Sequence, residues 1–327
     1  MKRSSILALT VAVLVPLSAC GGGGDPLDAE SPESEGSAED DGTDDGSADD
    51  DGSADDAAAG GDVGEVVVGS ANFPENVLLA EIYAAALSDA GVDVSTTLNI
   101  GSRETYMAGL EDGSIDLIPE YTGGLATYLN PEITVTSSEE VLAEAEQNLP
   151  DGLQLLQISE AEDKDSLVVT SETADELGLT SMADLEPHAA DLVLGGPPEF
   201  ESRPNGVDGL REVYGLEFAQ FRSLSAGATL TVQSLVNGQV DVANIFTTDP
   251  AIEENDLVVL EDPESLFAAQ NVVPLISSDK VNGTVEEALN EVSDALTTEN
   301  LTEMMVQVVT EGQDPADVAR EFLDENL

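Results

Sequence analysis

The sequence predicts an α/β protein built from two similar lobes. From residue 65 onward, short apolar strands alternate with amphipathic helices, which is typical of parallel βαβ construction. The same order of helix, glycine, buried strand and aromatic residue also occurs twice, about 125 residues apart. With 327 residues, 41% of them hydrophobic, the chain is long enough for one or two domains with a sizeable core.

The first half of this pattern begins with the apolar run Val66–Val68. The expected elements are, in order, a strand over 66–68, a helix over 75–90, a strand over 94–99, a helix over 103–112 and a strand over 115–118. Pro74 suits the first position of a helix, and Gly91 and Gly113 suit helix ends. The last strand is expected to lead into a loop over 119–124.

The second half repeats the pattern in matching positions. The segment Leu235–Val242 corresponds to Leu110–Leu117, with a glycine that ends a helix and an aspartate between apolar residues. Eight residues after each of these glycines stands an aromatic residue followed by threonine: Tyr121 in the first half and Phe246 in the second. Since ligands of open α/β sheets bind beyond the carboxyl ends of the strands, the two lobes are expected to form a cleft between those ends.

The first 64 residues are expected to be a signal peptide followed by a tether. Lys2 and Arg3 precede an apolar run over 6–17, which is too short to span a bilayer and is typical of a signal peptide. The run ends in Leu-Ser-Ala-Cys, which resembles the bacterial lipoprotein signal. The resemblance implies cleavage after residue 19, lipid on Cys20 and export; the alternative is an ordinary secretory peptide. Residues 20–64, dominated by small and acidic residues, are expected to be a disordered tether.

The charge and composition exclude several function classes. The chain has 68 acidic and 9 basic residues, a formal net charge of −59, so it lacks the basic face that binds nucleic acid or an anionic membrane. One Cys and one His make a disulfide framework, a metal site or a Ser-His-Asp triad unexpected. No GxSxG, HExxH or GxxxxGK[ST] pattern occurs. We therefore expect no enzyme activity, metal or cofactor.

Six segments of the chain resemble signatures of one group of proteins. These segments are Gly69–Asn76, Leu98–Glu104, Ile115–Gly123, Gly195–Phe200, Gly209–Leu216 and Phe246–Asp249. The group comprises the glycine betaine/choline-type (quaternary amine, osmoprotectant) substrate-binding proteins of ABC importers. The likeness runs from Val66 to Phe322, and the Pro-Glu-Tyr-Thr-Gly segment at 119–123 is its most specific piece.

The resemblance implies a type II periplasmic-binding fold, in which two α/β lobes are joined by two crossover strands. We place the crossings near 167–169 and 257–260. Lobe I is then expected over 65–166 plus 263–327, and lobe II over 167–262.

The resemblance also implies a cage of aromatic side chains around the ligand. A quaternary ammonium has no N–H to donate, so its recognition relies on shape and on cation–π contacts with ring faces. The aligned aromatics are Tyr121 and Phe246, and looser candidates are Phe73, Tyr106 and Phe200. Polar candidates on the same loops are Asn72, Thr122, Thr247 and Asp249, of which Asp249 alternatively caps a helix beginning at Pro250. Arg203 is favoured over Arg103 for holding a ligand carboxylate.

We therefore expect a binding protein that is lipid-anchored on the extracytoplasmic face of the membrane. It is expected to act as a monomer and to deliver an osmoprotectant to an ABC permease with a cytoplasmic ATPase. Three alternatives stay open at this point. They are a binding protein for another zwitterion (an amino acid or an ectoine-like solute), a secreted hydrolase using paired carboxylates, and a passive acidic surface-layer protein.

The remaining acidity predicts a strong dependence of stability on salt. From residue 63 onward, 52 acidic residues face only seven basic ones. Repulsion between these charges destabilises the folded state in dilute buffer, and salt screens it. We expect the melting temperature of the protein to be higher in molar salt than in dilute buffer. An equal or lower melting temperature in salt would contradict our hypothesis that the chain is adapted to a saline environment.

Overall fold

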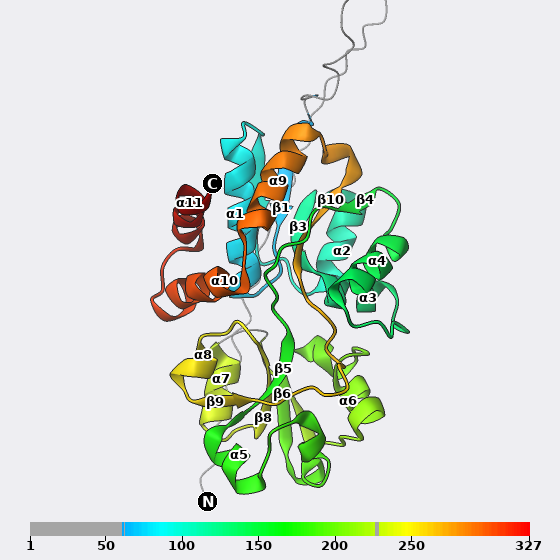
Figure 1. Cartoon of the computed structure of the whole chain (residues 1–327), viewed down its shortest axis with the longest axis vertical. Helices are drawn as coiled ribbons and strands as arrows, with labels where there is room; N and C mark the ends of the chain where they lie inside the picture. The colour runs from blue at the N-terminus through cyan, green and yellow to red at the C-terminus, as the bar shows by residue number, and fades with distance from the viewer. Residues whose placement is uncertain (1–60, 62, 226–228) are drawn as a thin grey trace, which may run out of the picture. The chain divides into compact units, whose positions relative to one another are not determined.

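The computed structural model describes residues 61, 63–225 and 229–327. The expected signal peptide, Cys20 and nearly all of the expected tether lie outside these residues. Within the described ranges, no helix is long and apolar enough to cross a membrane. Two five-stranded sheets organise this part of the chain, with helices packed against each (Figure 1).

The sheet of the first lobe has the strand order β2-β1-β3-β10-β4. Its strands are β1 (Val66–Gly69), β2 (Val94–Thr97), β3 (Leu117–Tyr121), β4 (Leu153–Leu155) and β10 (Val272–Ser277). β1 runs parallel to β2 and β3, whereas β10 runs antiparallel to β3 and β4. The expectation of a loop over 119–124 was wrong: residues 119–121 belong to β3 and pair with 272–274 of β10, and residues 122–124 form the first turn of the helix Thr122–Leu129.

Helices cover both faces of this first sheet. They are α1 (Pro74–Asp89), α2 (Arg103–Asp112), α3 (Thr122–Leu129), α4 (Ser138–Asn148), η4 (Ser278–Lys280), α9 (Gly283–Ala295), α10 (Thr298–Met305) with the π-helical turn η5 (Val306–Thr310), and α11 (Pro315–Asn326). Leu117 and Ile276 point into the core with α1, α9 and α11, while their neighbours Ile118 and Leu275 point into the core with α2, α3 and α4. This alternation follows from the two-residue period of a strand.

The sheet of the second lobe has the order β7-β6-β8-β5-β9. Its strands are β5 (Asp165–Thr170), β6 (Val193–Gly196), β7 (Gln220–Ser223), β8 (Val242–Phe246) and β9 (Leu257–Val259). The helical segments are α5 (Ser171–Leu177), η1 (Met182–Leu185), η2 (Ala189–Asp191), η3 (Pro198–Glu201), α6 (Val207–Tyr214), α7 (Thr229–Val236) and α8 (Ala251–Glu254). β6 is parallel to β7 and β8, and β5 is antiparallel to β8 and β9.

The repeat predicted from the sequence is visible in the structure, because the same aspartate hydrogen bond occurs at the matching position of each lobe. Asp116, just before β3, accepts a hydrogen bond from the Val67 N–H of β1 at 2.9 Å. Asp241, just before β8, accepts one from the Val193 N–H of β6 at 2.8 Å. In both lobes the aspartate carboxylate thus holds the start of one strand beside its parallel neighbour, which explains why this residue recurs between apolar ones.

The two crossings between the sheets do not lie where the sequence predicted them. β5 and β9, which contain the segments expected to cross, are paired with each other inside the second sheet. The passages are instead the connecting segments 156–164 and 260–271, which precede β5 and follow β9. They lie side by side, with an antiparallel bridge between Glu162 and Asn271 and a 3.2 Å hydrogen bond from the Asp163 N–H to the Gln270 carbonyl.

Candidate ligand-binding site

A pocket lined by both lobes lies at the carboxyl ends of their parallel strands. Its volume is about 670 Å³, including its opening to solvent. The first lobe contributes residues that follow β1, β2 and β3, and the second contributes residues that follow β6 and end β8. The connecting segments contribute Asp163 and Gln270. The pocket therefore lies where the strand-end rule predicts a ligand.

Three aromatic rings from separate parts of the chain meet in this pocket. Phe73 is the N-cap of α1, whereas Tyr121 and Phe246 are the last residues of β3 and β8. The Phe73 ring centroid lies 6.0 Å from that of Tyr121 and 5.2 Å from that of Phe246, with interplanar angles of 32° and 44°. Phe73 thus joins the two strand-end aromatics, one from each lobe, into a single aromatic cluster.

The Tyr121 ring is fixed by a buried carboxyl. Its hydroxyl donates a 2.8 Å hydrogen bond to Glu75 Oε1, and Glu75 Oε2 accepts a hydrogen bond from the Thr248 hydroxyl of the second lobe. Burial and the charge of Glu75 raise the pKa of Tyr121 well above its ordinary value, so the phenol keeps its proton and acts as donor. The carboxyl of Glu75 therefore orients a pocket ring and bonds to both lobes.

A second buried carboxyl, Glu120, organises the other side of the pocket. It accepts two 2.8 Å hydrogen bonds from the Arg103 guanidinium and one of 2.7 Å from the Tyr106 hydroxyl. Burial alone would lower the pKa of Arg103, but Glu120 raises it above the ordinary value, so the guanidinium stays charged. Arg103 also packs against Gly124, where an added Cβ would lie 2.6 Å from its Nη2 atom. The second glycine after Tyr121 is required by this contact.

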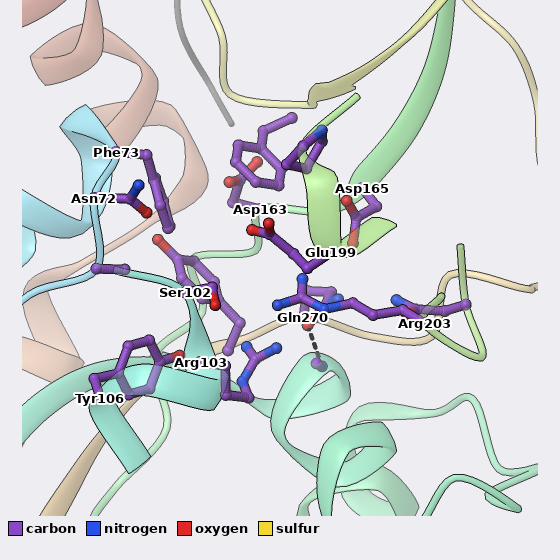
Figure 2. A pocket seen from close by; sticks show the side chains of 16 residues that line it. Asn72, Phe73, Ser102, Arg103, Tyr106, Asp163, Asp165, Glu199, Arg203 and Gln270 are labelled. Atoms are coloured by element: carbon purple, nitrogen blue, oxygen red, sulfur yellow. Dashed lines mark hydrogen bonds between the residues drawn. The ribbon is translucent and has the colours of Figure 1, made fainter. Parts of the chain in front are cut away.

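Carboxylates line the side of the pocket across from Arg103 and Tyr106. Asp163, Asp165 and Glu199 lie together there in Figure 2. Asp165 accepts a 2.9 Å hydrogen bond from the Asn244 amide, and Asp163 accepts a 3.2 Å bond from the Thr248 N–H. Burial raises the pKa of Asp165, and burial together with the Glu75 charge raises that of Asp163. These acids place three carboxyl groups on the flank of the aromatic cluster.

The other guanidinium of the pocket, Arg203, extends in from the second lobe (Figure 2). It pairs with Glu104 of the first lobe at N···O distances of 3.2–3.3 Å. The side chains of Arg203 and Glu104 are 24% and 46% exposed, so solvent screens this pair. Arg103 and Arg203 thus both have a carboxylate partner, but only the pair of Arg203 is open to water.

The structure brings six of the ten predicted binding residues together. Asn72, Phe73, Tyr106, Tyr121, Arg203 and Phe246 line the pocket. Their role in binding stays a prediction.

The other four do not line the pocket. Thr122 is buried and bonds to the Ala269 carbonyl and the Asn271 N–H, Phe200 packs in the core of the second lobe with Phe267, and the Thr247 hydroxyl accepts from the Lys164 N–H. Asp249 accepts from the Ala251 N–H at the start of α8, which is the capping alternative.

Sequence reasoning missed the carboxylates of the pocket. Asp163 and Asp165 flank the point at which the chain enters the second sheet, and Glu199 lies in η3. In a chain with 68 acidic residues, carboxylates carry little signal. The positions of Asp163 and Asp165 would have followed only from a correct placement of the connecting segment 156–164.

Comparisons with known proteins agree with the geometry. The family described as the substrate-binding domain of ABC-type glycine betaine transport systems matches residues 64–325. The chain is 28% identical over 275 residues to the glycine-betaine-binding protein of Pseudomonas aeruginosa, covering 79% of this chain and 87% of that protein. It is 24% identical over 264 residues to the ergothioneine transport permease/ergothioneine binding protein EgtU of Helicobacter pylori, covering 79% of this chain and 47% of that protein.

A solved structure supports the fold. The crystal structure of a glycine betaine/carnitine/choline ABC transporter aligns with a TM-score of 0.64 at 22% identity, covering 80% of this chain and 98% of that one. At this identity the likeness concerns the fold alone. Together with the two sheets described above, it confirms the expected two-lobed periplasmic-binding fold.

The two arginines of the pocket predict contrasting effects on stability. Arg103→Met leaves Glu120, whose side chain is fully buried, without its positively charged partner. The substitution is expected to lower the free energy of unfolding by about 3–5 kcal/mol. Arg203→Met, the matched control, breaks a screened pair and is expected to cost about 0–1 kcal/mol. Urea unfolding of both variants measures the difference. Equal losses would show that Glu120 does not depend on Arg103.

Proposed function

Because the chain belongs to the family of substrate-binding domains of ABC-type glycine betaine transport systems, we propose that it captures a quaternary amine such as glycine betaine or choline. The observation that carries the proposal is the cluster of Phe73, Tyr121 and Phe246 in the pocket. A ring face attracts a cation, and each well-placed ring contributes about 0.5–2 kcal/mol. The trimethylammonium group would contact these rings, because it has no N–H group for the polar residues to bind.

The charged residues of the pocket support a cationic ligand group. Asp163, which is buried, and Asp165, which is half-buried, place carboxyl groups on the flank of the ring cluster, and the reduced access of water there strengthens their attraction for a cation. A ligand carboxylate, present in glycine betaine and absent from choline, would meet Arg203. Arg203 is the guanidinium whose present partner, Glu104, is exposed to solvent and therefore replaceable.

Capture is proposed to proceed by closure of the two lobes over the ligand. Polar contacts between the lobes include Thr248 to Glu75, Arg203 to Glu104, and the Thr310 hydroxyl of η5 to Glu254 of α8 at 2.6 Å, and the Phe73 and Phe246 rings also meet across the lobes. The connecting segments lie beside the pocket, so rotation about them opens or closes it. The closed form would then dock on a permease whose cytoplasmic ATPase supplies the energy of transport.

The proposed ligand class predicts a charge requirement for binding. In calorimetric titrations of the purified protein in molar salt, we expect micromolar affinity for at least one of glycine betaine, choline and proline betaine. Phe73→Leu keeps an apolar side chain but removes the ring, and is expected to weaken binding by about 2- to 30-fold.

The neutral carbon isostere of choline, 3,3-dimethylbutan-1-ol, is the matched control ligand. It has the shape of choline without its charge and is expected to bind at least about tenfold more weakly than choline. Equal affinity for choline and its isostere would contradict recognition of the ligand through cation–π contacts. A folded sample that binds none of the quaternary amines but binds ectoine or an amino acid would move the assignment to another zwitterion.

We also propose that Cys20 carries a lipid that holds the protein on the extracytoplasmic face of the membrane. The support is the Leu-Ser-Ala-Cys sequence that ends the apolar run over 6–17. In a bacterial host, Cys20→Ala is expected to abolish labelling by a fatty-acid analogue and to move the protein from the membrane fraction to the soluble one. Unchanged labelling and fractionation of Cys20→Ala would contradict the anchor.

A further inference from the structure

Two buried carboxyl groups, Glu75 and Asp163, lie beside the aromatic cluster, and both accept a hydrogen bond from Thr248. Glu75 is in the first turn of α1 and 2% exposed, and Asp163 is in the connecting segment 156–164 and 4% exposed. Two neighbouring buried carboxylates without a cation beside them repel each other, and a proton on one of them removes this repulsion. The pair therefore holds one proton and one negative charge.

The groups that face this pair from the packed elements leave it without a positive partner. Tyr121 of β3 donates to Glu75, and Thr248 donates its hydroxyl to Glu75 and its N–H to Asp163. The Thr247 hydroxyl lies 3.3 Å from Asp163 Oδ1, and the charge of Asp249 adds repulsion at Glu75.

The basic residues near the pocket are paired elsewhere. Lys164 pairs with Glu162, Arg103 with Glu120 and Arg203 with Glu104. None of the ion pairs of the described residues involves Glu75 or Asp163. In agreement with this, burial raises the pKa of both groups. The shared proton thus takes the place of a missing cation.

We propose that a cationic ligand entering the pocket expels the proton shared by Glu75 and Asp163, so that capture of the ligand releases a proton. The inference rests on the proposed function, because it needs a cation against the rings that Asp163 flanks (Figure 2). The O–H bond of the shared proton breaks, the proton leaves to water or buffer, and the ligand's permanent charge replaces it beside two carboxylates. No electrons are transferred.

Release of the proton also strengthens the contact between the lobes. Once both groups are ionised, the two donors of Thr248 in the second lobe face full carboxylates, and hydrogen bonds to charged acceptors are shorter and stronger than those to neutral ones. A neutral ligand cannot displace the proton and gains no such tightening. Glu75 and Asp163 therefore make closure respond to the charge of the bound molecule.

The test is a calorimetric titration with choline at one neutral pH in two buffers, phosphate and Tris, whose ionisation enthalpies differ. The dependence of the measured heat on the buffer gives the number of protons released, expected to reach up to about one per bound choline. The affinity of the protein for choline is expected to rise by up to about tenfold per pH unit where the pair titrates. Heats that are equal in the two buffers, with binding intact, would overturn the linkage.

Variants separate the pair from the other pocket acids. Glu75→Gln and Asp163→Asn each replace one carboxyl group of the pair by an uncharged amide of the same shape without a titratable proton, and both are expected to bind choline with no buffer-dependent heat. Glu199→Gln, the matched control, removes a pocket carboxylate outside the pair and is expected to retain proton release at whatever affinity remains. Proton release that persists in both pair variants would overturn the assignment to Glu75 and Asp163.

A ligand-free measurement distinguishes failure of this inference from failure of the proposed function. The pKa of the folded pair is raised, so its contribution to the free energy of unfolding is fullest at low pH and is lost as the pH rises through the folded pKa. The difference between wild type and Glu75→Gln in urea unfolding against pH isolates this loss. If that loss is present but no quaternary amine binds, the proposed function and the linkage both fail. If choline binds without proton release, only the linkage fails.

Discussion

The carboxyl of Glu75 fixes the geometry of the pocket and its charge together. It accepts hydrogen bonds from Tyr121 in the first lobe and from Thr248 in the second, and in our proposal it shares a proton with Asp163, to which Thr248 also donates. A buried carboxyl without partners would be strongly unfavourable, so these groups have to remain together. The orientation of one ring, the contact between the lobes and the proton content of the pocket therefore depend on one side chain.

The aromatic cluster depends on this arrangement because the chain has few aromatic residues to use. Of seven Phe and five Tyr, three reach the centre of the pocket from positions far apart in the sequence. Tyr121 and Phe246 occupy the same position in the two repeated lobes, and Phe73 contacts both. For the proposed cationic ligand, the acids on the flank would compensate for the small number of rings, since Coulomb attraction to a carboxylate adds to the weaker attraction of ring faces.

Much of the fold was predictable from local sequence. Pro74, Gly113 and the recurring aspartates Asp116 and Asp241 each have a mechanical role that the structure confirms. The crossings were misplaced because apolar runs mark buried strands whether or not they cross, and β5 and β9 are both buried parts of one sheet.

Within the site, residues tied to strand ends were easier to place than those tied to packing. The pocket positions of Tyr121 and Phe246 could be predicted from the repeat. Phe200 also follows a strand end, but its side chain packs in the core of the second lobe. Asp163 had no visible signal among so many acids. Its neighbour Glu75 is 88 residues away in the chain, and the two carboxyl groups come to the common donor Thr248 only in the folded protein.

A crystal structure of the protein with bound choline would test the central claim most directly. The account predicts the choline nitrogen within about 6 Å of the ring centroids of Phe73, Tyr121 and Phe246, on the side flanked by Asp163. A choline bound with its nitrogen away from these rings, or outside this pocket, would contradict it.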